Sequence, residues 1–337
     1  MNKNSAKTRH IHYAIRAVCC FILAVCAFIA ITQIDYRAIF DEFTAIGYEP
    51  SSELDEIVSD LRLTSKGMRV FKATRAELQE ADAFNESCPN ADSNYYVLGC
   101  YNHDQIYVYN IKHRELPGIR QSTLAHEILH AVWARMSNRE RDELKSSLDS
   151  VYASNEDLAE HLKLYNEDSF YDELHSIAGT QIDKSQMPPV LAAHYAKYFE
   201  KQSKVYDFFA DYNNRFKAIR TRLEELEKII AEKRASYEEF LKTYEADNAK
   251  LSQDIADFNE RSRSTSNGFS TIEEWQLKRQ ELADRQAEMS KRYSELLERI
   301  TEINKYINEY NANILRTKEY TKVMNSHGAD AADDVAE

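Results

Sequence analysis

Two histidines flank a glutamate in the segment His126-Glu127-Ile128-Leu129-His130. On a helix, residues four apart project from one face, so the two imidazoles can share a zinc ion through their ring nitrogens. The glutamate between them points to one side of that face, where it can deprotonate a water on the metal. The pattern therefore predicts a zinc site that activates water, with His126 and His130 as ligands and Glu127 as general base.

The sequence around this motif predicts that it lies on a helix. Pro117-Gly118 interrupts the preceding segment, and Ser122 or Thr123 can cap the helix start. Apolar residues then recur at helical spacing and predict a buried stripe of Ala125, Ile128, Leu129, Val132 and Met136. The two motif histidines avoid that stripe and align with each other. This alignment weakens the alternative of two ordinary histidines on an amphipathic helix.

A zinc site that performs hydrolysis needs a third protein ligand and one open position. Residues 171–180 read as the end of a second helix, which Gly179 stops. Groups that could supply the third ligand follow the motif: Glu156, Asp157, Glu160, His161, Glu167, Asp168, Asp172, Glu173 and His175.

The two helices, from about residue 122 to residue 180, resemble the gluzincin branch of zinc metallopeptidases, the thermolysin-like arrangement. The resemblance implies that Glu173 is the third ligand; the alternative is a charge on a solvated helix face. In that family Ser and Asp follow at the third and fourth positions after the glutamate, and the Asp orients a zinc histidine. This chain has Ser176 and Ile177 there, so the orienting carboxylate is missing or comes from elsewhere, with Asp172 as the candidate. The resemblance also implies an oxyanion-stabilising His or Tyr, for which the candidates are His175, His194, Tyr195 and Tyr198.

The segments before the motif predict a β-hairpin. Residues 95–101 and 105–111 are rich in β-branched and aromatic residues, and a short polar segment separates them. A short helix is expected at residues 52–61 and a strand at residues 68–73. In zinc peptidases of this type, a sheet edge beside the active-site helix holds the substrate by main-chain hydrogen bonds. The alternative is a hairpin that only packs against the helix.

The N-terminal residues predict attachment to a membrane. Residues 1–16 are basic, no acidic residue precedes Asp35, and residues 17–34 carry no charge. Such a run can just span the hydrocarbon core as a signal anchor, leaving the N-terminus in the cytoplasm and the bulk of the chain outside it. A cleaved signal peptide is the alternative. Only Cys88 and Cys100 lie outside this run, and in an oxidising compartment we expect them to form a disulfide.

The C-terminal part of the chain has a different composition. From about residue 201 glycine and proline nearly vanish, and apolar residues recur in heptads on both sides of a break at residues 262–271. This pattern predicts an antiparallel coiled-coil hairpin over residues 201–325, with a parallel dimer as the alternative. Residues 326–337 predict a disordered acidic tail. The net charge of −13 argues against nucleic-acid binding.

The sequence as a whole predicts an α+β fold. Its expected parts are the transmembrane segment, a small zincin-like domain of mixed sheet and active-site helices at residues 35–200, and the hairpin. The expected function is a membrane-anchored metallopeptidase that uses one Zn²⁺ to hydrolyse a protein or peptide substrate outside the cytoplasm. The alternative is a non-catalytic, membrane-tethered interaction protein with a structural or vestigial zinc site. A protein partner or self-association through the coiled coil is compatible with both.

Overall fold

The protein is described by a computed structural model at residues 36–89, 96–155, 158, 162, 165, 167–264 and 268–327. The chain forms two compact units. The first runs to residue 210, except for residues 113–116, and contains the histidine motif. The second comprises residues 113–116 and the chain from residue 211 onward, and contains most of the two long helices.

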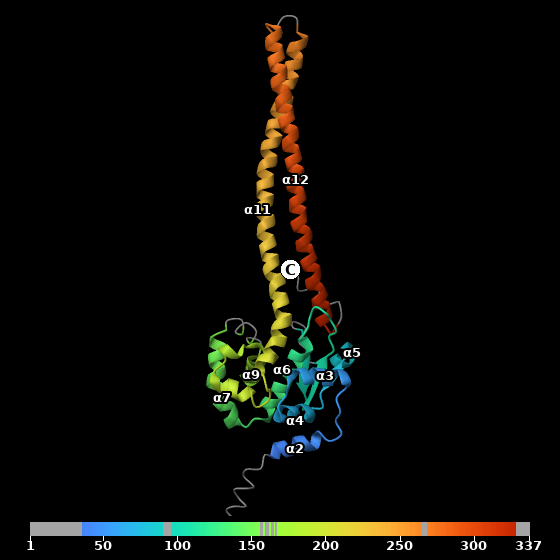
Figure 1. Ribbon diagram of the computed structural model, residues 1–337, viewed down its shortest axis with the longest axis vertical. Helices are drawn as coiled ribbons and strands as arrows, with labels where there is room; N and C mark the ends of the chain where they lie inside the picture. The colour runs from blue at the N-terminus through green and yellow to red at the C-terminus, as the bar shows by residue number, and fades with distance from the viewer. Residues whose placement is uncertain are drawn as a thin grey trace, which may run out of the picture. The chain divides into compact units, whose positions relative to one another are not determined.

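Helices dominate the first unit (Figure 1), which also contains one small sheet. The helices are α2 (Tyr36–Thr44), α3 (Ser52–Leu61), α4 (Ser65–Ala73), α5 (Ala81–Ser87), α6 (Ile119–Arg135), α7 (Asn138–Ala153), α9 (Glu167–Gln181), α10 (Pro189–Tyr195) and the 3₁₀ turn Lys184–Gln186. The strands are β1 (Glu77–Gln79), β2 (Gly99–Asn102) and β3 (Gln105–Tyr109). Their order in the sheet is β1-β3-β2, with β1 parallel and β2 antiparallel to β3.

The prediction of an α+β fold was wrong, because the described chain is mostly helical and its sheet has only three short strands. The clearest error concerns residues 68–73, which were predicted as a strand and lie in helix α4. Thr64 caps this helix by accepting a hydrogen bond from the Gly67 N–H, and Val70, Phe71 and Ala73 are buried on one side of it. A cap and a helical apolar face outweigh the β propensity of single residues.

The prediction of a transmembrane helix was also wrong for the part of the chain that the structure describes. No helix there is long and apolar enough to cross a membrane. Residues 1–35, which include the predicted basic terminus and anchor, lie outside the described residues. Most of the predicted tail, residues 328–337, does so as well.

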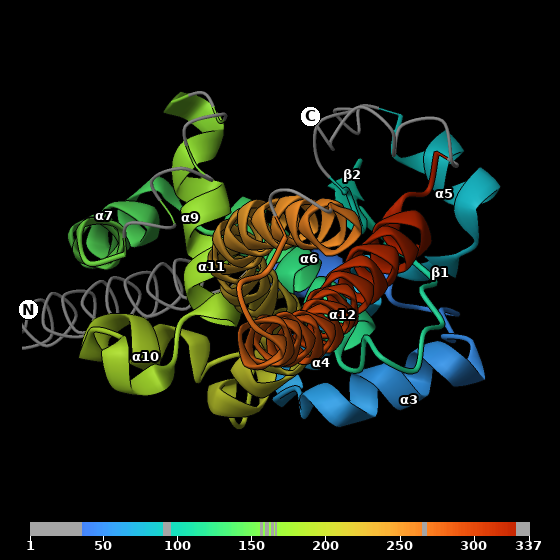
Figure 2. The same cartoon turned by 90° about the horizontal axis from the view of Figure 1, so that it is seen from above.

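Helix α6 lies at the centre of the first unit and contacts α3, α4, α9, β2 and β3. The predicted apolar stripe is buried along its whole length and belongs to the main core. The helix begins earlier than predicted, because Gly118 rather than Ser122 or Thr123 is its N-cap. The histidine motif therefore lies in the middle of a 17-residue helix. Seen along the other axis, α9 lies beside α7 at the edge of the same unit (Figure 2).

The predicted β-hairpin is present, with shorter strands than expected. Strands β2 and β3 pair around a two-residue turn, His103-Asp104, and both turn residues have positive φ, as tight hairpin turns require. Cys100 of β2 forms the predicted disulfide with Cys88, which follows α5. The disulfide therefore links strand β2 to the end of helix α5.

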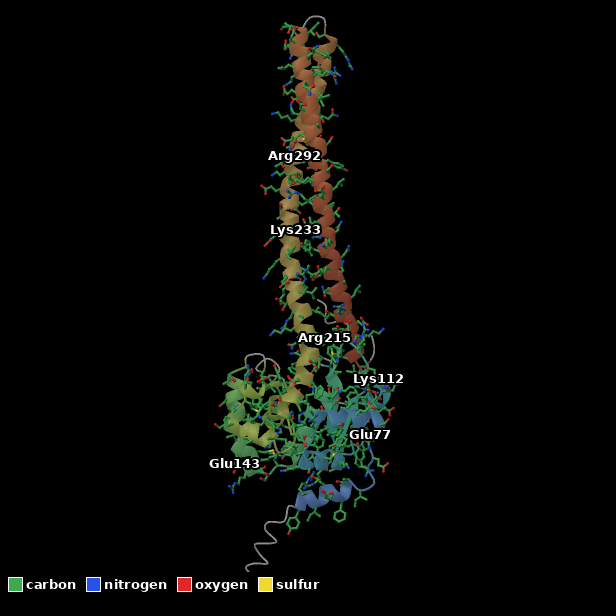
Figure 3. The ribbon with its side chains drawn as sticks, viewed as in Figure 1. Glu77, Lys112, Glu143, Arg215, Lys233 and Arg292 are labelled. Carbon is green, nitrogen blue, oxygen red and sulfur yellow. A yellow bond between two sulfur atoms is a disulfide. The ribbon has the colours of Figure 1, made fainter. Side chains whose placement is uncertain are left out.

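The long C-terminal helices are α11 (Gln202–Arg263) and α12 (Ile272–Met324). Within the second unit they run antiparallel (Figure 3). Ion pairs join them along their length. Lys233 pairs with Glu302 at 2.8 Å, and nearer the turn Asp247 pairs with Arg292 at 2.6 Å. The buried seam comes from both helices and includes Leu226, Leu251, Leu282, Met289, Leu296 and Ile303. The heptad pattern is thus satisfied within one chain.

Candidate metal centre

Helices α6 and α9 bring His126, His130 and Glu173 together. The two Nε2 atoms lie 3.0 Å apart, and each lies 3.4 Å from a carboxylate oxygen of Glu173. Ligand atoms about 2.0 Å from a tetrahedral zinc ion lie roughly 3.3 Å from one another, so these distances fit such an ion. The three residues could therefore hold a metal ion.

The close approach of the two helices depends on Gly179. A Cβ at this position would lie 2.3 Å from Cδ1 of Leu129 and 2.7 Å from Cε1 of Tyr195. The prediction that Gly179 ends the helix was wrong, since α9 continues to Gln181. Its role is to let α9 pack tightly against α6 and α10, which places Glu173 beside the motif histidines.

The carboxylate of Asp172 accepts a hydrogen bond from Nδ1 of His130, the ring nitrogen that faces away from Glu173. The distance from Nδ1 to Oδ1 is 2.8 Å, and because a carboxylate only accepts, the Nδ1–H of His130 donates this bond. Nε2 is then the atom that faces Glu173 and His126. Such a carboxylate fixes the tautomer and the ring orientation of a metal-binding histidine. Asp172 therefore orients His130, a role that Ile177 cannot fill because it has no carboxylate. Asp172 was the candidate that the sequence offered for this role.

Charges within the cluster favour an ionised ligand set. Burial disfavours charge on Glu173, but the positive charges of His126 and His130 and their hydrogen bonds outweigh it and hold the pKa of Glu173 well below its usual value. Burial likewise opposes the protonation of His130, yet the carboxylates of Asp172 and Glu173 raise the pKa of His130 well above its usual value. A metal ion that binds here replaces the proton of His130 and meets a carboxylate that is already deprotonated.

Glu127 lies between helix α6 and strand β2. It is only 5% exposed, and a Cβ on Gly99 would lie 2.8 Å from both its Cγ and its Oε1. Burial raises the pKa of Glu127, and the positive charges of His130 and His126 oppose this shift. A carboxylate with a raised pKa beside three candidate metal ligands is a suitable proton acceptor at neutral pH. The absence of a side chain at Gly99 leaves the space that this carboxylate fills.

Several alternative third ligands take no part in the described cluster. Asp172 contacts the outer nitrogen of His130, and His175 bonds to His194 instead. The remaining alternatives are Glu156, Asp157, Glu160 and His161, which lie outside the described residues, and Glu167 and Asp168, whose side chains are not described. Among the residues that the structure describes, Glu173 is the carboxylate that completes the cluster.

The four oxyanion candidates form a cluster of their own. Nε2 of His175 lies 2.9 Å from Nε2 of His194, the hydroxyl of Tyr195 donates to the carbonyl of His175, and Tyr198 lies 5.5 Å from His194 between ring centres. Burial lowers the pKa of both histidines, to about 3 for His194, so both are neutral. An oxyanion role for any of the four stays a prediction.

Sequence reasoning missed two parts of this site, the space at Gly99 and the close contact at Gly179. The only sign of them in the sequence was the two glycines themselves. Helix and strand patterns give no reason to connect these glycines with the histidine motif. Comparisons of the chain with known protein families, curated proteins and solved structures found no match. The function is therefore inferred from the geometry and chemistry of the site.

Proposed function

We propose that the first unit is a zinc-dependent peptidase. The observation that carries the proposal is the convergence of two Nε2 atoms and one carboxylate on two packed helices, directly beside Glu127. Two imidazoles and one carboxylate are a donor set that suits zinc, and three protein ligands leave a fourth position for water or substrate. Structural zinc sites, in contrast, usually have four protein ligands.

Each side chain has a distinct part in the proposed reaction. Zinc, when bound, supplies a Lewis acid that lowers the pKa of a water and polarises a carbonyl. Glu127 accepts the proton of the attacking water and passes it to the leaving amine. Asp172 keeps Nδ1 of His130 protonated, so that Nε2 is free to bind. The side chains of His126 and His130 are 19% and 16% exposed, which leaves the cluster open to a substrate.

Strand β2 supports a protein or peptide as the substrate. It is an edge of the described sheet, with β3 on one side, and its Gly99 lies against Glu127. An extended peptide that pairs with such an edge is held by its main chain, next to the proposed base. The Cys88–Cys100 disulfide supports a compartment outside the reducing cytoplasm.

The test compares metal content and peptide cleavage in variants of the full-length protein. Glu127→Gln keeps both histidines and should retain zinc, while turnover of a broad peptide library falls by about 10²–10⁴-fold for lack of a base. His126→Ala should bind zinc much more weakly and lose activity. The matched control is Glu143→Gln, an exposed glutamate of α7, which should change neither.

Two results would argue against a peptidase. One is a wild-type protein that holds zinc but whose cleavage is unchanged in Glu127→Gln. The other is a first unit that unfolds when zinc is chelated and has no Glu127-dependent activity. That second outcome would favour the alternative, an interaction protein with a structural zinc site.

A further inference from the structure

A second cluster of charged side chains surrounds a cavity of about 200 Å³ in the first unit. Helices α2, α4, α6 and α7 contribute its walls, and none of the metal-binding residues lines it. Its charged lining consists of the cations Arg37, Lys66, Arg69 and Arg135 and the carboxylates Asp41 and Glu140. The lining cations outnumber the lining carboxylates, but Asp104 and Glu42 beside the cavity pair with Arg37, Arg135 and Arg69. Lys66 is the lining cation without an ion pair among the described residues, and its charge favours an anionic ligand.

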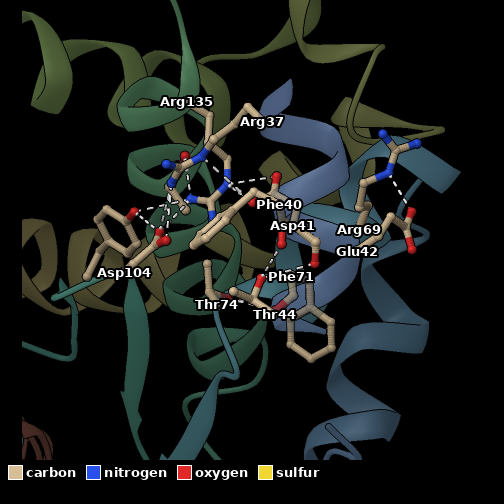
Figure 4. A network of polar contacts seen from close by, with 12 residues as sticks. Arg37, Phe40, Asp41, Glu42, Thr44, Arg69, Phe71, Thr74, Asp104 and Arg135 are labelled. Atoms are coloured by element: carbon tan, nitrogen blue, oxygen red, sulfur yellow. Dashed lines mark hydrogen bonds and ion pairs between the residues drawn. The ribbon is translucent and has the colours of Figure 1, made fainter. Parts of the chain in front are cut away.

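Arg135 supplies the strongest sign that this cavity takes a ligand. Its side chain is only 7% exposed, and its Nε donates to both oxygens of Asp41 at 3.1 Å (Figure 4). Its Nη1 donates to the hydroxyl of Tyr101 and to the carbonyl of Ala131, and lies 2.9 Å from Oδ1 of Asp104. Its Nη2 is buried and has no hydrogen-bond partner among the residues that the structure describes. A buried charged donor without an acceptor is costly, so an acceptor that enters the cavity would be bound favourably.

The other cations of the cavity retain hydrogen-bonding capacity. Arg69 forms an ion pair with Glu42 through Nε at 3.0 Å, and Arg37 contacts Asp104 through Nη2 at 3.1 Å and Asp41 through Nε at 3.8 Å. The Lys66 ammonium lies 5.1 Å from the ring centre of Tyr198, and it forms no ion pair among the described residues. The cavity therefore presents several cationic donors from separate helices to one small volume.

We propose that this cavity binds a phosphate group. A phosphate offers several acceptor oxygens in a tetrahedral arrangement, which suits donors that converge from different helices. Its negative charge also suits Lys66, the lining cation that forms no ion pair among the described residues. The group can come from a free phosphate in solution or from the headgroup of an anionic lipid. Since α2, one wall of the cavity, exposes Ile39, Phe40 and Phe43, the test covers both sources.

The first arm measures binding of inorganic phosphate to the full-length protein by calorimetry, against chloride at equal ionic strength. Lys66→Gln and Arg69→Gln each remove a partly exposed cation of the cavity and should weaken phosphate binding by about tenfold, the usual effect of one charge-assisted hydrogen bond. Lys72→Gln is the matched control, because Lys72 lies on the same helix outside the cavity lining. It should bind phosphate as the wild type does. Phosphate binding no stronger than chloride, or equal loss in Lys72→Gln and Lys66→Gln, would overturn the proposal.

The second arm measures co-sedimentation with phosphatidylcholine vesicles that contain or lack phosphatidylglycerol. If a lipid headgroup is the source, the wild type and Lys72→Gln sediment only with the phosphatidylglycerol vesicles, and the Lys66→Gln/Arg69→Gln double variant does not. If free phosphate is the source, the variants behave alike with vesicles and differ only in calorimetry. Both outcomes support phosphate binding in the cavity, and they distinguish a lipid headgroup from free phosphate as its source.

Discussion

Two pairs of contacting histidines lie in the first unit, and their chemistry is opposite. In the pair His126–His130 the Nε2 atoms are 3.0 Å apart, and in the pair His175–His194 they are 2.9 Å apart. The first pair has carboxylates beside it, which raise the pKa of His130 well above its usual value despite burial. The second pair lies among aromatic rings, including Trp133, and burial lowers the pKa of both of its members.

The difference shows that proximity of histidines does not by itself make a metal site. Helix α9 carries members of both clusters: Asp172 and Glu173 contact the motif histidines, and His175, two residues later, contacts His194. Residues two apart on a helix point to nearly opposite sides. The carboxylate of Glu173 therefore faces away from His175, and together with Asp172 it gives the motif histidines the negative charge that a divalent metal requires.

The largest expected effect is on metal affinity. His126→Ala should weaken zinc binding several hundred-fold, because each ligand of a zinc site contributes about 3 kcal/mol or more. His194→Ala removes a member of the other pair and should leave zinc affinity within a factor of a few. Competition titration with a metal chelator measures both. Equal losses in the two variants would remove the distinction between the pairs.

A smaller effect is expected from the carboxylate that orients His130. Asp172→Asn keeps the shape of the side chain but removes its charge, and it should weaken zinc binding by about 10–100-fold. Asp142→Asn, an exposed aspartate on α7, serves as the control and should have no effect. An Asp172→Asn protein with wild-type affinity would show that the 2.8 Å contact does not position the ligand.

The metal affinity should also depend on pH. Because the pKa of His130 is raised in the metal-free protein, a proton competes with the metal at neutral pH. Apparent zinc affinity should therefore rise by about tenfold per pH unit up to the pKa of His130 as that proton is released. Affinity measured from pH 6 to pH 8, with proton release followed in two buffers, checks this. No pH dependence would mean that His130 is neutral before the metal binds.

The pair His175–His194 should make folding stability depend on pH, because burial lowers the pKa of both histidines. The pKa of His194 falls from about 6.5 in the unfolded chain to about 3 in the folded one. Below pH 6.5 the unfolded chain binds the extra proton, so folding stability decreases as the pH falls towards 3. The loss is about 1 kcal/mol per pH unit for one such histidine. Urea unfolding of His194→Gln at pH 6 and pH 5 should show a shallower dependence than the wild type, and an unchanged slope would contradict a neutral, buried His194.

Local patterns in the sequence predicted the three candidate metal ligands. The spacing of His126 and His130 fixes their common face, and the resemblance to two-helix zinc sites pointed to Glu173, with Asp172 as a candidate partner. The histidine spacing is a property of one helix, whereas the choice of Glu173 came from the resemblance. The disulfide was likewise predictable, because only two cysteines remained to form it.

Features that depend on packing between elements were not predictable. Residues 68–73 have β-forming side chains, but their burial against the core and the Thr64 cap make them helical. Gly179 resembles a helix stop in sequence and is instead a contact point between helices. His175 and His194 lie 19 residues apart, and only the fold reveals that they form a buried pair. Each of these requires knowledge of what lies opposite a residue in space.

The most direct test of the account is X-ray absorption at the zinc edge of the zinc-loaded, full-length protein. If His126, His130 and Glu173 hold the metal, the spectrum shows two imidazoles and two oxygen ligands, one of them water, at about 2.0–2.2 Å. His126→Ala would reduce the imidazole count, and the His194→Ala control would leave it at two. Three or four imidazoles, or a count that falls in His194→Ala, would contradict the assignment of the metal to the carboxylate-flanked pair.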